Sequence, residues 1–100
     1  MDIQKLITMG RLTKTVVYDG IAFEMSTPAT DNINDINDNL DLLCVFITKI
    51  GDKEFSTPED KVGLKVVLKQ MQGVVVHSLV KKAGEMIEQQ TELVEGITKK

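Results

Sequence analysis

The dipeptide Asp19-Gly20 is the feature that most restricts how this chain can fold. It separates two strand-like runs, LTKTVVY and IAFEM. Asp-Gly is typical of two-residue type I′ turns, because both turn positions need a positive φ. The second run alternates apolar and polar residues, so three apolar side chains share one face: Ile21, Phe23 and Met25. A lone hairpin is marginal in water, so the predicted hairpin over residues 12–26 must pack on the rest of the chain.

A long apolar periodicity follows the hairpin. Ser26-Thr27-Pro28 ends the sheet, and Thr27 is the expected N-cap, with Thr30 or Asp31 as caps one turn later. The run LLCVFI would also suit a buried strand, but the periodicity continues on both sides of it and favours a helix. Apolar residues recur at alternating spacings of three and four: Ile33, Ile36, Leu40, Leu43, Ile47 and Ile50.

Two further helices are predicted. Thr57-Pro58-Glu59-Asp60 combines an N-cap, a first-turn proline and first-turn acids. We expect four apolar residues to give this helix its core side: Val62, Val66, Leu68 and Met71. Gln72-Gly73 predicts a break before a last helix over about 74–95. Its expected core residues are Val76, Val80, Ala83, Ile87 and Val94, with Leu79 and Met86 beside them.

The predicted fold class is therefore α+β, mainly α. An N-terminal β-hairpin precedes about three helices that pack as a small bundle. We expect a single domain over residues 1–100, with the hairpin at 12–26, the helical part at 28–96 and a short tail at 97–100. Residues 1–11 could form a short helix or a strand, and the angle between the last two helices is left open.

Composition favours one soluble domain in a reducing compartment. The chain has 100 residues, of which 42% are hydrophobic and 27% charged, with a net charge of −3. A single cysteine allows no intrachain disulfide. The start lacks the apolar core of a signal peptide, and the longest apolar run is too short to span a bilayer. We expect a cytoplasmic protein without a membrane segment.

The stretch TDNINDINDNLD resembles the start of a calcium loop. Asp35, Asn37, Asn39 and Asp41 fall at alternate positions. With Asp35 as the first loop residue, the sixth would be Leu40 instead of glycine, and the twelfth would be Phe46 instead of glutamate. We therefore interpret the acids as the dipole-favoured start of a helix, and predict no metal site.

Catalytic chemistry has little support in the sequence. Cys44 and His77 are the only cysteine and the only histidine, and both stand on or beside predicted apolar helix faces. No third group is positioned to orient a base. There is no glycine-rich phosphate loop and no GxSxG motif. We predict no catalytic residues, no bound cofactor and no enzymatic activity.

Two charged groups are candidates for docking. The acidic group is Asp31, Asp35 and Asp38, expected on one helix face, and the basic group is Lys61, Lys65 and Lys69, at helical spacing. The lysines could follow a phosphate backbone or be simply solvated. The two groups could also pair between protomers, because such charges steer association and set register. The mildly acidic total argues against a general nucleic-acid binder.

Candidate partner-binding residues lie on the hairpin face and on the last helix: Ile21, Phe23, Met25, Val76, Leu79, Val80 and Met86. The alternative is that these side chains close the small core on itself. The sequence leaves both interpretations open.

Three stretches in order resemble small phage tail-assembly chaperones, including those of baseplate-hub assembly. They are VVYDGIAFEMSTPAT, the helix end ITKIGDKEF, and STPEDKVGLKVVLKQM with its following VVVHSLVKKAGEMIEQQ. The chain departs from the family pattern at Gln72-Gly73, where a proline or a more definite loop is expected. The resemblance implies no catalytic residues. It implies binding to tail components such as tape-measure, tail-tube or hub subunits, often as an oligomer.

The predicted function is protein–protein contact without catalysis, as a chaperone that covers apolar surface of a phage tail or baseplate component. The expected location is the host cytoplasm. One alternative is a small structural virion protein, such as a connector, baseplate or decoration subunit. A second alternative is a small regulator that binds nucleic acid or a host protein.

Overall fold

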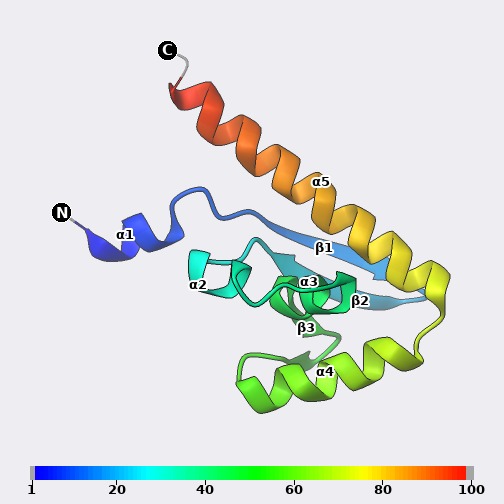
Figure 1. Ribbon diagram of the computed structural model, residues 1–100. Coiled ribbons are helices and arrows are strands. Elements are labelled where there is room, and N and C mark those ends of the chain that lie inside the picture. Colours follow the sequence, from blue (N-terminus) through cyan, green and yellow to red (C-terminus); the bar gives the residue numbers. More distant parts are fainter. Residues whose placement is uncertain (1, 99–100) are drawn as a thin grey trace.

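The computed structural model describes the backbone of residues 2–98 and the side chains of residues 2–93. It is an α+β fold in which an N-terminal antiparallel sheet precedes packed helices (Figure 1). In chain order the elements are α1 (Ile3–Thr8), β1 (Thr13–Tyr18), β2 (Ile21–Ser26), α2 (Thr30–Ile33), α3 (Asn39–Phe46), β3 (Ile47–Ile50), β4 (Lys53–Glu54), α4 (Pro58–Gln70) and α5 (Gly73–Thr98).

The predicted hairpin is confirmed. β1 and β2 pair antiparallel, with Tyr18 opposite Ile21 across the turn. Asp19 and Gly20 have φ values of 53° and 79°, as a type I′ turn requires. Phe23 and Met25 are buried, so the apolar face of β2 does pack on the rest of the chain.

The single helix predicted after the hairpin is wrong at both ends. α2 ends at Ile33, and the backbone stays non-helical until Asp38, whose side chain accepts a hydrogen bond from the Asp41 amide and caps α3. Short polar side chains in this stretch bond to nearby backbone groups and so compete with the helix. The helix also stops at Phe46, because Ile47 turns to a β conformation and pairs with Met25.

Thr27 has a different role from the predicted helix cap. Its side chain is buried, and its Oγ1 accepts a 3.0 Å hydrogen bond from the Leu12 amide. Its own amide donates to the Leu12 carbonyl at 2.9 Å. Thr27 therefore extends the hairpin by one residue pair. Ala29 precedes α2 without a side-chain cap, and Thr30 is the first helical residue.

The sheet has the strand order β1-β2-β3-β4, so β1 and the two-residue β4 form its edges. The sequence analysis did not predict β3 and β4, which flank the turn after Ile50. Gly51 occupies a position with φ of 58°, which favours glycine, and its amide donates to the Ala22 carbonyl at 2.8 Å. This contact holds the β3-β4 turn against the centre of the sheet.

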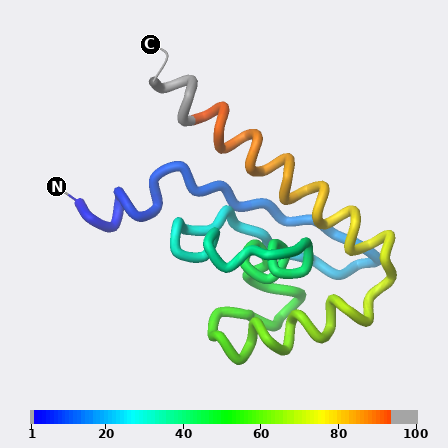
Figure 2. Tube along the Cα trace, viewed as in Figure 1, coloured from blue at the N-terminus to red at the C-terminus, as the bar shows by residue number. Residues whose placement is uncertain are grey.

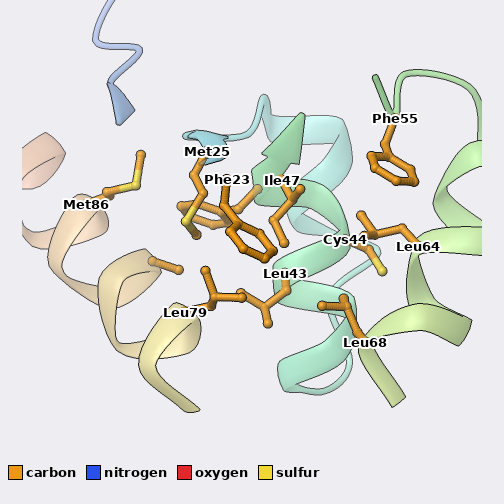
Figure 3. Close-up of a cluster of buried hydrophobic side chains, with 12 residues drawn as sticks. Phe23, Met25, Leu43, Cys44, Ile47, Phe55, Leu64, Leu68, Leu79 and Met86 are labelled. Atoms are coloured by element: carbon orange, nitrogen blue, oxygen red, sulfur yellow. The ribbon is translucent and has the colours of Figure 1, made fainter. Parts of the chain in front are cut away.

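The core lies between one face of the sheet and the helices. Figure 3 shows Met25 and Phe23 of the sheet facing Leu79 and Met86 of α5, while Leu64 and Leu68 of α4 pack on the other side of α3. α3 is thus the centre of the helical layer. The buried hydrophobic residues are Phe23, Met25, Leu43, Cys44, Phe46, Ile47, Phe55, Leu64, Leu68, Leu79, Ala83 and Met86.

The start of α4 and the break after it are confirmed. Thr57 caps the helix, Pro58 is its first residue, and the Thr57 and Asp60 side chains form a reciprocal capping box. α4 ends at Gln70, and α5 begins at Gly73. α5 extends to Thr98, beyond its predicted end, so part of the predicted tail is helical and residues 99–100 lie outside the described chain.

The buried line of α5 is Leu79, Ala83 and Met86, whereas Ile87, expected in the core, is 42% exposed. The side chain of Val94, also expected there, lies outside the described side chains.

The undecided N-terminal segment contains a helix, α1. It begins after Asp2, whose carboxylate accepts from the amides of Gln4 and Lys5. No residue of α1 is buried. Figure 2 shows α1 and the outer part of α5 extending from the same end of the molecule. No helix within residues 2–98 is both long and apolar enough to cross a membrane.

Candidate protein-binding groove

The described part of the chain contains a half-open groove of about 780 Å³. It lies between the segment around α2, the polar face of β2 and β3, and the N-terminal half of α4. Both Thr-Pro segments of the sequence, Thr27-Pro28 and Thr57-Pro58, line it. Its apolar lining consists of Pro28, Ala29, Val45, Phe55, Pro58 and Val62.

The sheet supplies a polar wall. Glu24 and Thr48 lie on neighbouring strands and point away from the face that carries Phe23 and Met25. The Thr48 hydroxyl lies 3.2 Å from the Glu24 carbonyl oxygen and 3.1 Å from its carboxylate Oε1. These contacts fix the Glu24 side chain along the wall.

An ion pair joins α3 to α4 in the groove. Lys65 Nζ lies 2.7 Å from Asp41 Oδ1, and Asp41 Oδ2 also accepts from the Asn37 amide at 3.2 Å. The hydrogen bond from Lys65 lowers the pKa of the Asp41 carboxyl, with the Asn37 amide acting in the same direction. The same bond raises the pKa of Lys65. Both groups therefore keep their charges over a wide pH range.

Lys61 is held by the backbone. Its Nζ donates to the Ile47 carbonyl at 2.6 Å, at the junction of α3 and β3. Partial burial lowers the pKa of this ammonium group, because the charged form loses hydration. Cys44 is buried beside this residue, and its thiol lies 3.8 Å from the Lys61 carbonyl oxygen. Burial raises the pKa of Cys44, with the Asp41 charge acting in the same direction, so the thiol is kept protonated and unreactive.

The N-terminus of α4 reaches the groove, but it is already capped by its own side chains. Thr57 Oγ1 accepts from the Asp60 amide at 3.1 Å, and Asp60 Oδ2 accepts from the amides of Ser56 and Thr57. The hydrogen bonds with Thr57 lower the pKa of the Asp60 carboxyl. This helix end thus carries its own anion, and it does not offer a vacant anion site.

Only some residues of the two charged groups predicted from the sequence lie together in the groove. Lys61, Lys65 and Asp35 line the groove, while Lys69 is exposed elsewhere on α4. The acids do not share a helix face, because the chain is non-helical at Asp35 and Asp38 caps α3. Asp31 is exposed on α2. Lys65 pairs with Asp41, an acid that the prediction did not include, and it does so within one chain.

The predicted partner-binding residues lie mainly in the core. Phe23, Met25, Leu79 and Met86 are at most 5% exposed, so a partner does not reach them in this fold. Val76 and Val80 are half-buried beside the core, and Ile21 is 48% exposed at the end of the hairpin. The alternative interpretation, that these side chains close the core, describes their positions better.

Three apolar residues of α4 face solvent: Val67, and two that the sequence analysis assigned to the core. Val62 is 68% exposed and Val66 is 51% exposed, and they lie four residues apart beside the groove. The core side of α4 instead carries Leu64 and Leu68, with the stems of Lys61 and Lys65 beside them. The four-residue spacing of Leu64 and Leu68 was the signal in the sequence that could have identified this core side. Lysines next to such leucines can bury the aliphatic parts of their side chains while their ammonium groups stay in water.

Within the described residues, no group of three potential metal ligands comes together. His77 is exposed on α5, and Cys44 is buried beside Lys61. The predicted calcium-like stretch supplies Asp38 as a helix cap and Asp41 as an ion-pair partner.

No protein-family model, curated protein or solved structure matches this chain.

Proposed function

We propose that this protein acts by binding another protein, and that the groove beside α4 holds an extended, partly apolar segment of that partner. The observation that carries the proposal is the exposed pair Val62 and Val66, which continues the apolar lining of a half-open groove. A contiguous apolar surface with a polar border is typical of interaction sites.

The charged groups of the groove support binding over chemistry. Lys65 is paired with Asp41, and Lys61 donates to a backbone carbonyl. Neither group is arranged to move a proton to a substrate. Paired charges at the edge of an apolar contact orient a partner and restrict its register.

The resemblance to phage tail-assembly chaperones gives the proposal its partner class. In that role the protein covers an apolar segment of a tape-measure, tail-tube or hub subunit and releases it when the subunit assembles. The groove suits such a role because its two walls come from different parts of the chain, so a bound segment would be enclosed from both sides.

Co-expression with individual phage tail and baseplate subunits tests this function. We expect the protein to keep one of these subunits soluble and to co-purify with it. Val62→Glu with Val66→Glu should abolish co-purification, because two charges would enter the apolar contact. Val74→Glu is the matched control, since Val74 is 77% exposed at the start of α5, away from the groove.

Retention of the partner by the Val62 and Val66 double variant, with its fold intact by circular dichroism, would contradict the groove assignment. Mass spectrometry of purified particles separates the chaperone from the structural alternative. A chaperone is absent from the mature particle, whereas a connector, baseplate or decoration subunit remains in it.

A further inference from the structure

We propose that two copies of this protein associate through a second surface, at the end of the molecule where the two chain ends lie. This terminal surface consists of Ile3, Leu6, Ile7 and Met9 on and after α1, with Ile87 and Leu93 on α5. None of these six residues lines the groove beside α4, although Arg11, which follows α1, does.

The first argument is that α1 has too little support within one chain. A six-residue helix is unstable alone in water, because nucleation costs more than a single turn of hydrogen bonds returns. Ile3, Leu6 and Ile7 share one side of the helix and are 63%, 48% and 59% exposed. An apolar helix face of this kind is normally covered.

The second argument is that α5 continues beyond the core. Among its side chains up to residue 93, the last fully buried one is Met86, and Ile87 and Leu93 are 42% and 48% exposed. The outer part of α5 is joined to the segment after α1 where Gln90 Nε2 donates to the Gly10 carbonyl at 3.0 Å. From that junction the two elements diverge, which leaves their apolar side chains uncovered (Figure 1).

The third argument is charge complementarity, which identifies a second copy of this chain as the partner at the terminal surface. Residues 3–12 carry Lys5 and Arg11 and no acid, whereas residues 84–93 carry Glu85, Glu88 and Glu92 and no base. Glu85 is engaged by Lys82 at 3.5 Å, which leaves Glu88 and Glu92 exposed. The basic α1 segment of one copy therefore complements the acidic outer α5 of another in both charge and apolarity.

Two-fold symmetry allows both contacts to form at once. If α1 of the first copy packs on α5 of the second, rotation about the symmetry axis packs α1 of the second on α5 of the first. Each chain thus contributes to the interface one basic segment, around α1, and one acidic segment, on the outer part of α5. The contact closes after two copies, so it gives a dimer and not an open fibre.

Light scattering on the purified chain tests the dimer. We expect a mass twice the 11.1 kDa of one chain, decreasing toward one chain mass as salt rises. Lys5→Glu with Arg11→Glu should give a monomer, and Glu88→Lys with Glu92→Lys should also give a monomer. All four side chains are exposed, so the fold is expected to survive, as circular dichroism would verify.

The decisive experiment mixes the two charge-reversed proteins. In a reciprocal dimer, acidic α1 of one variant meets basic α5 of the other, while the unchanged segments also remain complementary. The mixture should therefore form a heterodimer, although neither variant dimerises alone. The proposal fails if the unmodified chain is a monomer, if the single variants remain dimeric, or if mixing restores no dimer. Binding of an unmodified monomer to anionic lipid vesicles would overturn it as well, in favour of a membrane surface.

The two proposals fail separately. Loss of dimerisation in the Glu88 and Glu92 variant, whose changed residues do not line the groove, with intact partner binding leaves the groove assignment standing. Loss of partner binding in the Val62 and Val66 variant with an intact dimer leaves the terminal surface standing.

Discussion

Asp41 shows how one side chain can serve both the backbone and a distant helix. One carboxylate oxygen accepts from the Asn37 amide, at the irregular segment before α3. The other accepts from Lys65, on α4. Asp41 therefore connects the end of the non-helical segment to the helix that forms the opposite wall of the groove. Its position in the chain, among seven other acids and asparagines of residues 30–41, gave no sign of this.

Asp41→Asn is expected to lower the free energy of unfolding at pH 7. As the pH is lowered, the free energy of unfolding should also fall less in the variant than in the unchanged protein. Because the pKa of Asp41 is below its usual 3.8 in the folded protein, its stabilising contribution is present above that value. The contribution is lost as pH falls through the folded-state pKa. Urea midpoints at pH 7 and at pH 2 measure this, and the gap between wild type and variant should close at the lower pH.

Asp31→Asn is the matched control, because Asp31 is exposed and has no hydrogen bond among the described side chains. A gap for Asp41→Asn that is equally large at both pH values would show that the Lys65 pair does not contribute in this way.

At the scale of elements, the two Thr-Pro segments behave differently despite similar sequences. Thr57 caps α4 in a capping box, whereas Thr27 is part of the sheet and Ala29 precedes α2 without a side-chain cap. α4 has 13 residues, and α2 has four. The acid at the third helical position of α4, Asp60, distinguishes the two, because it completes the box.

Thr57→Ala should destabilise the fold by about 1 kcal/mol, the usual cost of losing a Ser or Thr N-cap. Thr30→Ala should cost less than about 0.5 kcal/mol, the usual range for an exposed surface position. Urea denaturation of both variants at neutral pH gives the comparison. Equal losses for the two would mean that the capping box does not set the start of α4.

Local signals of this kind explain which elements were predictable. Asp19-Gly20 and Thr57-Pro58 set the backbone conformation at their own positions. The hairpin and the start of α4 could therefore be predicted from a few residues. Ile47 could not, because its periodicity suits a helix and only pairing with Met25 across the sheet makes it a strand residue. The groove depends on contacts between residues 17 and 24 positions apart, Cys44 with Lys61 and Asp41 with Lys65. Sequence spacing does not report such contacts.

At the scale of the whole molecule, α3 unites two packing layers. Leu43 and Phe46 are fully buried in α3, which meets the sheet and α5 on one side and α4 on the other (Figure 3). All the buried hydrophobic residues form one cluster. The chain should therefore unfold as one unit, even though the groove side and the α5 side are formed by different helices.

Leu64→Ala tests this unity. Leu64 is fully buried in α4, and its truncation should cost about 2–5 kcal/mol. Tyr18 is the only tyrosine and the chain has no tryptophan, so its fluorescence reports on the opposite side of the core, where its hydroxyl lies 2.6 Å from that of Ser78. The transition seen by Tyr18 should shift together with the transition seen by far-ultraviolet circular dichroism.

Val67→Ala provides the comparison, because Val67 is 46% exposed on the same helix and should move neither transition by more than about 0.5 kcal/mol. If Leu64→Ala shifted the circular dichroism transition and left the Tyr18 transition in place, α4 would unfold separately from the sheet.

The position of the hairpin turn has a practical consequence for studying this protein. Asp19 and Gly20 are exposed, and the turn between β1 and β2 lies at the end of the molecule opposite the two chain ends (Figure 1). An affinity tag or fluorophore attached at either chain end would stand beside the terminal surface and could itself alter the measured mass. A reporter inserted at the hairpin tip would leave the terminal surface unobstructed, and is the better choice for counting how many copies assemble.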